Sequence, residues 1–394
     1  MTEEFIKKYS TARHGTDSLK WDALDVRFGD SDLTAMWVAD MEFHTCEQIT
    51  DAMIERCKHG IFGYTYIPDK YYKTFSDWME KHHNWPIQKE WVRFATGVVA
   101  SLYWMVNCFT NPGDACIILT PVYYPFHYAV KDTGRKLVTC DLVNTNGYFT
   151  IDYNAFEKAI IDNDVKLFIQ CSPHNPTGRL WKEDELDKVM AICQKHSVLV
   201  VSDEIHQDII VCDKKQIPAV IVSGGRYTDN LVILSAASKT FNLAGLLHSH
   251  IIIPDAKIRE KYDAYAKTVN RTDINILGAL ATRTGYEYGE EWLNGVLGVI
   301  KRNYSYLKEG LAEVAPGIVV SPLEATYLVL LDLRSYIKPE EVKDFIQNRC
   351  RLAVDFGEWF GANFKGFVRL NLATDPKYVI TAVENIGREI SKLK

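Results

Sequence analysis

The sequence has no long apolar segment and no dense block of positive charge. Among its 394 residues no run of 18 or more is apolar, and the opening stretch MTEEFIKKYS has no apolar core of the kind that a signal peptide carries. No cluster of Lys and Arg is long enough to follow a nucleic-acid backbone or an anionic membrane, and the formal net charge is -6. We therefore expect a cytoplasmic protein that binds small molecules and neither nucleic acid nor membranes.

Several common catalytic motifs are missing as well. The sequence contains no GxGxxG, GxxxxGK[ST], HExxH or GxSxG motif, which removes the usual support for nicotinamide enzymes, nucleoside triphosphatases, zinc proteases and serine hydrolases. Its nine cysteines form no CxxC pair, so we expect buried free thiols and no metal site. The pair His82 and His83 lies in a polar stretch without i, i+4 spacing, which predicts solvated surface.

The pattern that is present is typical of an α/β protein. Short apolar runs alternate with helical stretches between about residues 92 and 254, and this predicts a mostly parallel sheet flanked by helices. The expected strands are residues 92–95, 116–119, 167–171, 198–202, 231–235 and 250–253. The helix over 183–195 is expected to place its apolar residues on one face.

The C-terminal part changes character and predicts a second, smaller α+β unit. Its expected elements are a long helix over 290–313, strands over 326–333 and 366–372, and a helix over 339–349. A chain of 394 residues exceeds what one hydrophobic core usually serves. We therefore predict a large domain over residues 46–284 and a small domain built from both termini, residues 1–45 and 285–394.

Polar residues follow four of the expected strands. The four segments are ATGVVASLY (95–103), QCSPHNPTG (170–178), VVSDEIHQD (200–208) and SAASKTFN (235–242). Open parallel sheets bind ligands at the ends of such strands. In the first segment, Gly97, Val98 and Val99 open a helix expected to run to Phe109, and a free helix N-terminus attracts an anion such as phosphate.

Lys239 stands in an unusual setting for a lysine. It follows an expected buried strand and lies among Ser, Ala and Thr, where little water reaches it. Desolvation lowers the pKa of an amine and leaves it neutral for Schiff-base chemistry. Taken singly, each of three residues also has a simpler explanation. Lys239 is then a surface lysine, Asp203 forms a structural salt bridge, and Asn175 belongs to a simple turn.

Taken together, the motifs resemble a known family. Asn175 in NPTG, Asp203 in SDEIH, Lys239 in SKTFN and Arg369 in VRLNLA resemble the pyridoxal 5'-phosphate enzymes of the aspartate-aminotransferase fold, fold type I, and the likeness covers nearly the whole chain. The resemblance implies that Lys239 holds the cofactor as a Schiff base and that Asp203 keeps the pyridine nitrogen protonated. It also implies that Asn175 bonds the 3-oxygen of the ring.

The resemblance assigns further residues to the cofactor and the substrate. Tyr123 would stack on the ring, and the turn Gly97-Val98-Val99 would cradle the phosphate. Arg369 would bind the α-carboxylate of an amino-acid substrate through two hydrogen bonds, with Asn175 also beside the substrate. Tyr64 would reach the phosphate and substrate of a neighbouring subunit, which implies a homodimer with shared active sites.

The sequence departs from the family pattern around the phosphate. Many relatives have a serine three residues before the lysine and an arginine about eight residues after it, whereas this chain has Ala236 and Leu247. Ser238 or Ser235 would replace the serine, and His248 or another donor would replace part of the arginine. The composition of the phosphate site therefore stays open.

The residues around Asp203 bear on the reaction. Transaminases of this fold commonly have a tyrosine three positions after the aspartate. In this sequence that position is His206, which the resemblance places beside the cofactor. The segments WVADMEF, SDEIHQD and SKTFN resemble the cystathionine β-lyase-like carbon-sulfur lyases. This implies cleavage of cystathionine, cysteine or cysteine S-conjugates to pyruvate, ammonia and a thiol, with Lys239 taking the Cα proton. Trp37, Phe43 and Tyr124 would line a pocket for the sulfur substituent or pack in the core.

The same residues are also compatible with two other functions. A class I/II aminotransferase would use the same cofactor and carboxylate anchor but pass the amino group to a keto acid. A regulatory protein that binds pyridoxal phosphate without turnover would retain the cofactor residues only.

Overall fold

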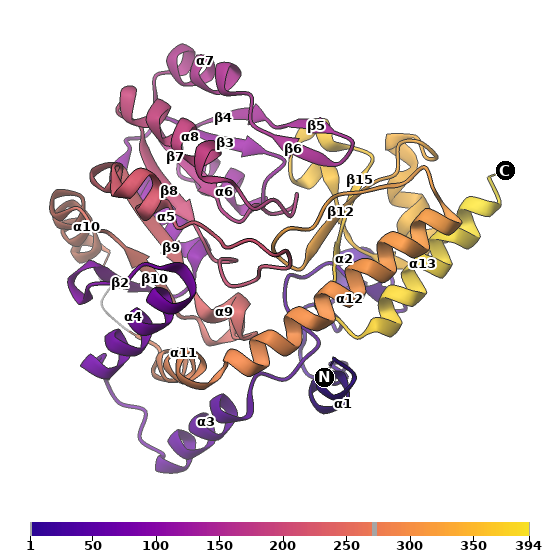
Figure 1. Cartoon of the computed structure of the whole chain (residues 1–394), viewed down its shortest axis with the longest axis horizontal. Helices are drawn as coiled ribbons and strands as arrows, with labels where there is room; N and C mark the ends of the chain where they lie inside the picture. The colour runs from indigo at the N-terminus through magenta and orange to yellow at the C-terminus, as the bar shows by residue number, and fades with distance from the viewer. Residues whose placement is uncertain (1, 270–273, 394) are drawn as a thin grey trace.

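A seven-stranded sheet forms the centre of the protein's larger part (Figure 1). The computed structural model describes residues 2–269 and 274–393. Across the sheet the strand order is β2-β10-β9-β8-β7-β3-β4; β10 is antiparallel to β2 and β9, and the other neighbouring pairs are parallel. The strands are β2 Val92–Ala95, β3 Ala115–Thr120, β4 Lys136–Asp141, β7 Val165–Cys171, β8 Leu199–Asp203, β9 Leu231–Ser235 and β10 Ser249–Ile252.

Helices cover both faces of this sheet. Along β3, Cys116 and Ile118 belong to one buried cluster whereas Ile117 and Leu119 belong to another, so successive side chains pack on opposite faces. The helices are α1 Thr2–Tyr9, α2 Leu24–Phe28, α3 Glu47–His59, α4 Asp69–His83, α5 Val98–Phe109, α6 Pro125–Lys131, α7 Tyr153–Asn163, α8 Glu183–Lys195, α9 Ala237–Thr240, α10 Ala256–Thr268, α11 Ile276–Tyr288, α12 Glu290–Val314 and α13 Pro376–Ser391. The expected α/β fold with a mostly parallel sheet is confirmed.

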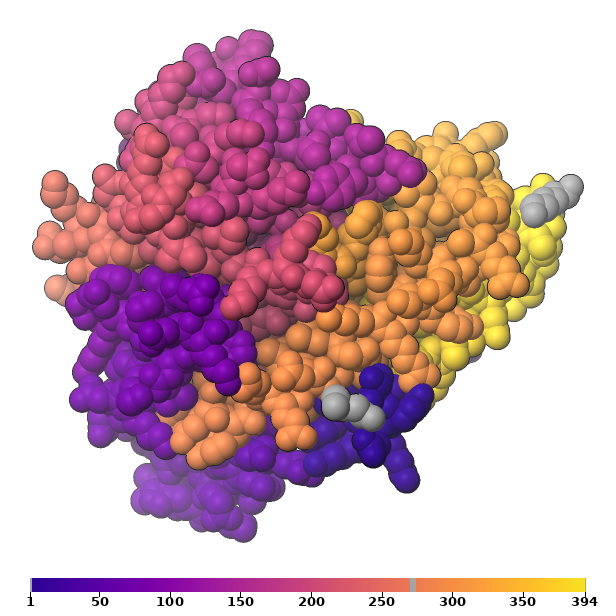
Figure 2. Space-filling view, viewed as in Figure 1, coloured from indigo at the N-terminus to yellow at the C-terminus, as the bar shows by residue number. Residues whose placement is uncertain are grey.

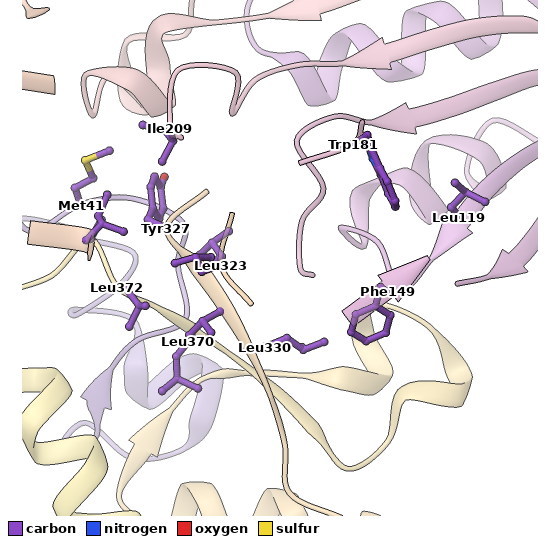
Figure 3. Close-up of a cluster of buried hydrophobic side chains, with 14 of the residues drawn as sticks. Met41, Leu119, Phe149, Trp181, Ile209, Leu323, Tyr327, Leu330, Leu370 and Leu372 are labelled. Carbon is purple, nitrogen blue, oxygen red and sulfur yellow. The ribbon is translucent and has the colours of Figure 1, made fainter. Parts of the chain in front are cut away.

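A second, antiparallel sheet lies beside α12 and α13 (Figure 1). Its order is β11-β12-β15-β14. The strands outside the larger sheet are β1 Thr34–Ala35, β5 Val143–Thr145, β6 Tyr148–Thr150, β11 Val319–Val320, β12 Leu328–Asp332, β13 Leu352–Ala353, β14 Asp355–Phe356 and β15 Phe367–Asn371. Figure 3 shows part of the core that joins the two sheets, where Leu119 of β3 belongs to the same buried cluster as Leu330 and Leu370.

The N-terminal residues pack against elements far along the sequence. β1 pairs in parallel with β13, and α1 lies against α12, where the indigo and orange surfaces meet in Figure 2. Gly295 on α12 makes this contact possible, because a Cβ atom there would lie 2.2 Å from the ring of Phe5. The predicted boundaries of a large domain over 46–284 and a small domain over 1–45 and 285–394 stay a prediction.

The structure differs from the sequence predictions at residues 339–349 and at three of the cysteines. Residues 339–349 form a short 3-10 turn, Pro339–Glu341, and a π-helical segment, Asp344–Arg349, in place of one regular helix. The nine cysteines are free, but Cys57 is exposed, and Cys108 and Cys212 are half-buried. No helix among the described residues is both long and apolar enough to cross a membrane.

The prediction of solvated surface at His82 and His83 is wrong. His83 is buried, and its Nε2 lies 2.8 Å from the Asp208 carboxylate. His82 packs over the ring of Trp78, with a centroid distance of 4.0 Å. The reason is the orientation of α4: His83 lies one turn after the buried Met79, so it shares the inward face of the helix.

Candidate active site

The polar residues predicted from the four strand-end segments meet in one cavity. It has a volume of about 370 Å³ and lies where β7, β8 and β9 end. Of the predicted residues, the cavity is lined by Gly97, Val98, Val99, Tyr123, Asn175, Asp203, His206, Ser238 and Lys239. Ala39, Thr96, Ala100, Cys171, Ile205, Ala244, Leu247 and His248 complete the lining. Because parallel strands end at one edge of a sheet, Gly97 and Lys239 come together here although they are about 140 positions apart.

Lys239 reaches into this cavity from α9. Its Nζ donates a hydrogen bond to the carbonyl oxygen of Ala39, at 2.6 Å. The same oxygen accepts a hydrogen bond from the hydroxyl of the buried Tyr327, at 2.8 Å. Burial lowers the pKa of Lys239 to about 8, although Asp40 and Asp203 partly oppose this shift. The amine therefore becomes neutral, and able to attack a carbonyl, at a lower pH than an exposed lysine does.

β8 ends at Asp203, Glu204 follows it, and the two carboxylates have different surroundings. Glu204 is fully buried and accepts hydrogen bonds from Ser202, Gln216 and the Ala219 backbone, at 2.9 to 3.1 Å. The Asp203 carboxylate lines the cavity and accepts one hydrogen bond among the described residues, from the Ile205 backbone at 3.1 Å. Burial raises the pKa of Asp203 to about 7. Asp203 thus has free acceptor capacity toward the cavity and would be stabilised as an anion by a cation there.

Asn175, Tyr123 and His206 form walls of the cavity beside these charged groups. The Tyr123 backbone N-H donates to the carbonyl oxygen of Asn175, at 3.2 Å, so the two loops are held together. Burial lowers the pKa of His206 well below its usual value, and the charges of Lys239 and Arg369 add to this effect. His206 is therefore neutral at pH 7, and its Nδ1 has no hydrogen-bond partner among the described residues.

Arg369 lies on β15 and contacts Asn175, which lines the cavity. The guanidinium is 2% exposed and donates to the Asn175 side-chain oxygen at 2.9 Å and to the Trp37 carbonyl oxygen at 3.0 Å. It also forms an ion pair with Asp355, which stands opposite it on β14. A buried guanidinium needs such a counterion. Sequence reasoning missed Asp355, although an acidic residue inside the apolar stretch AVDFG was a usable signal.

The three aromatic residues expected either at the substrate pocket or in the core lie in different surroundings from one another. Phe43 is 2% exposed and belongs to the main core, and Trp37 is 6% exposed and donates from its ring N-H to the Lys20 carbonyl oxygen. Tyr124 is half-buried beside Tyr123 and the edge of Trp359. Core packing therefore accounts for Trp37 and Phe43. Tyr64 is fully exposed and lies outside the cavity of its own chain.

The residues of the cavity fit the pyridoxal 5'-phosphate that the sequence resemblance implies. A lysine amine with a lowered pKa and a buried carboxylate with free acceptor capacity line the same space. At the end formed by Gly97, the first turn of α5 has no capping side chain, and a Cβ atom on Gly97 would meet nothing within 4 Å. Its free N-H groups can therefore receive a phosphate.

Comparison with known proteins gives a consistent result. Residues 32–386 match the aminotransferase class I and II family. The chain is 37% identical over 360 residues to the cystathionine beta-lyase PatB of Bacillus subtilis (strain 168), covering 91% of this chain and 93% of that protein. The crystal structure of cystalysin from Treponema denticola, which contains pyridoxal 5'-phosphate, has a TM-score of 0.93 and 34% identity over 98% of both chains. The PLP-bound C-S lyase from Staphylococcus hominis has a TM-score of 0.90 and 31% identity over 96% of both chains.

Proposed function

Because the chain belongs to the aminotransferase class I and II family, we propose that it is a pyridoxal 5'-phosphate-dependent carbon-sulfur β-lyase. Its substrates are cystathionine, cysteine or related cysteine S-conjugates, and its products are pyruvate, ammonia and a thiol. The observation that carries the proposal is the similarity, over more than nine-tenths of the chain, to proteins named cystathionine beta-lyase and C-S lyase. The placement of Lys239 and Asp203 in one cavity supports it.

Each polar residue of the cavity has a defined task in this proposal. Bound pyridoxal 5'-phosphate supplies an electron-withdrawing ring that stabilises negative charge at the substrate Cα atom. Lys239 holds the cofactor covalently through Nζ. The Asp203 carboxylate would accept a hydrogen bond from the ring nitrogen and keep it protonated, while Asn175 would donate to the ring oxygen and Tyr123 would cover one face of the ring.

Lys239 also moves the proton that starts the elimination. With the substrate bound, the neutral Nζ would take the proton from Cα, and the thiolate would leave Cβ with the electron pair of the broken C-S bond. The Ala39 carbonyl oxygen, 2.6 Å from Nζ, holds the amine near this position. Since burial lowers the pKa of Lys239 to about 8, the amine is a competent base near neutral pH.

Arg369 orients the substrate through its α-carboxylate. The guanidinium is held by Asn175, by the Trp37 carbonyl oxygen and by Asp355, so the plane of the group has a fixed orientation. Both N-H groups of Nη2 are bonded, to Trp37 and to Asp355, so a carboxylate that accepts two parallel hydrogen bonds from Arg369 would displace one of these partners.

Replacement of Arg369 by lysine should weaken substrate binding more than it slows turnover. Lysine retains the charge but loses the two parallel hydrogen bonds, at a cost of about 2 kcal/mol, so KM should rise by about thirtyfold. Steady-state kinetics with L-cystathionine measures this. Arg334→Lys is the matched control, since Arg334 lies on the surface and pairs with Asp332. An unchanged KM in Arg369→Lys would remove Arg369 from substrate binding.

The proposal includes a homodimer with shared active sites. Ile61, Phe62, Tyr64 and Tyr66 are each at least 58% exposed, which is unusual for large apolar and aromatic side chains gathered in one short segment. A second copy of the chain would cover this segment and bring its Tyr64 to the neighbouring cavity. Such an arrangement would make the phosphate and substrate sites complete only in the dimer.

A keto-acid-free assay distinguishes the lyase from an aminotransferase. The purified protein with bound cofactor is incubated with L-cystathionine in the absence of any keto acid. A lyase releases pyruvate and thiol at a steady rate, because each cycle restores the starting form of the enzyme. An aminotransferase stops after one turnover and resumes when 2-oxoglutarate is added. A protein that binds the cofactor but converts no amino acid would support the regulatory alternative and contradict the proposal.

A further inference from the structure

His248 stands beside the turn that is open to an anion. β10 and β2 are antiparallel with Ser249 opposite Ala95, and His248 and Thr96 are the next residues beyond this pair, shortly before α5 begins at Val98. His248 is 6% exposed and lines the cavity together with Gly97. The neighbouring position, where the family pattern led us to expect arginine, is Leu247. His248 is therefore a polar side chain next to the expected phosphate position.

The His248 ring is the outer member of a buried chain of three side chains. Its Nε2 lies 2.8 Å from the Tyr71 hydroxyl, and that hydroxyl lies 2.6 Å from Nε2 of His250. Tyr71 is 1% exposed and His250 is fully buried. Phe94 stacks on His248 and Phe75 stacks on His250, at centroid distances of 5.3 and 4.1 Å. Both rings are thus fixed in orientation.

The protons of this chain can be assigned by counting donors. Burial lowers the pKa of His248 to about 4 and that of His250 well below its usual value, and it raises the pKa of Tyr71, so all three groups are neutral at pH 7. A neutral imidazole has one N-H and one acceptor nitrogen. Nδ1 of His250 is buried and has no hydrogen-bond partner among the described residues, so a proton on it would lack an acceptor. His250 therefore donates from Nε2 to Tyr71, Tyr71 donates to Nε2 of His248, and the remaining proton of His248 is on Nδ1. In the opposite arrangement Nδ1 would present a lone pair, which repels an anion.

We propose that His248 donates a hydrogen bond from Nδ1 to the phosphate of the cofactor, and that Tyr71 and His250 act as positioning residues that fix the required tautomer. The inference rests on the proposed function, because it takes pyridoxal 5'-phosphate as the ligand. The chain of three neutral groups occupies the place of the missing arginine without adding a positive charge. The phosphate is then held by the N-H groups of α5 and by one oriented imidazole N-H.

The test compares two ligands that differ only in the phosphate. The full-length protein is freed of cofactor and titrated with pyridoxal 5'-phosphate or with pyridoxal, and binding is followed by the absorbance of the Schiff base. His248→Gln places an amide near the position of Nε2, whereas His248→Asn places one near the position of Nδ1. We expect His248→Gln to weaken pyridoxal 5'-phosphate binding by about tenfold, and His248→Asn to weaken it by less than about threefold. Neither variant should change the affinity for pyridoxal.

Tyr71→Phe tests the positioning role without altering His248. It should weaken pyridoxal 5'-phosphate binding by about threefold, with pyridoxal again unaffected, because the Nδ1 tautomer is no longer enforced. Tyr286→Phe is the matched control. This tyrosine stacks on Phe75 in the same cluster, and its buried hydroxyl has no hydrogen-bond partner among the described residues. Its affinities for both ligands should equal those of the wild type.

Three results would overturn the inference. Equal losses for both ligands would mean that the chain shapes the pocket and does not bind phosphate. An asparagine variant as weak as the glutamine variant would remove Nδ1 from the phosphate, and unchanged affinity in all variants would remove His248 altogether. A wild-type protein that binds neither ligand would contradict the proposed function itself, so the two failures are distinguishable.

Discussion

Replacement of Lys239 by alanine lowers turnover of L-cystathionine by at least about a thousandfold. In the proposed mechanism the variant loses both the amine that holds the cofactor and the base that takes the Cα proton, and a positioned base alone contributes roughly 10² to 10⁴ in rate. The absorbance of the Schiff base should also be lost. Steady-state pyruvate release and the absorption spectrum of the protein with added pyridoxal 5'-phosphate measure the two effects.

A small primary amine provides the control for this variant. Methylamine or ethylamine at high concentration can enter the space left by the side chain and should restore part of the activity, with more rescue at higher pH, where more of the amine is neutral. Rescue shows that the variant is folded and that the missing group is an amine. Near-wild-type turnover in Lys239→Ala would remove Lys239 from the chemistry.

Replacement of Asp203 by asparagine lowers turnover by roughly 10² to 10³. Asparagine has nearly the same shape but carries no charge, so in the proposed mechanism the ring nitrogen would no longer be kept protonated and the ring would stabilise less negative charge at Cα. The loss should fall on kcat, because the group acts on the reacting electrons and not on the substrate carboxylate. Kinetics with L-cystathionine at saturating cofactor measures it.

Stability gives an independent control for Asp203→Asn. In the cofactor-free protein, burial raises the pKa of Asp203 from its ordinary value to about 7, so its ionisation opposes folding as pH rises from about 4 through 7, and that cost is fully present above pH 7. Removing the charge should therefore leave the melting temperature at pH 8 equal or higher. Glu204→Gln changes the adjacent carboxylate, which is bonded away from the cavity, and should keep kcat within a few-fold. Equal kinetic losses in the two variants would contradict the role of Asp203.

Much of the fold follows from patterns that act locally. The expected strands over 231–235 and 167–171 are observed as β9 and within β7, because short apolar runs bounded by polar segments describe strands buried on both faces. The long helix expected over 290–313 is α12, which is one residue longer. The carboxyl ends of the strands then bring Asn175, Asp203 and Lys239 together, since the topology of a parallel sheet leaves them no other common edge.

The features that could not be predicted depend on packing between distant segments. The sequence places His83 in a polar stretch, but its burial depends on which face of α4 meets the core and Asp208. The pairing of Asp355 with Arg369 depends on the register of β14 and β15. The chain from His248 through Tyr71 to His250 joins residues almost 180 positions apart, so no local pattern indicates it.

Reduction of the Schiff base tests the central claim most directly. The protein is loaded with pyridoxal 5'-phosphate, treated with borohydride, digested and analysed by mass spectrometry. Our account predicts that one lysine, Lys239, carries the reduced pyridoxyl phosphate group. Labelling confined to another lysine, or no stable label on a protein shown to be folded, would contradict it.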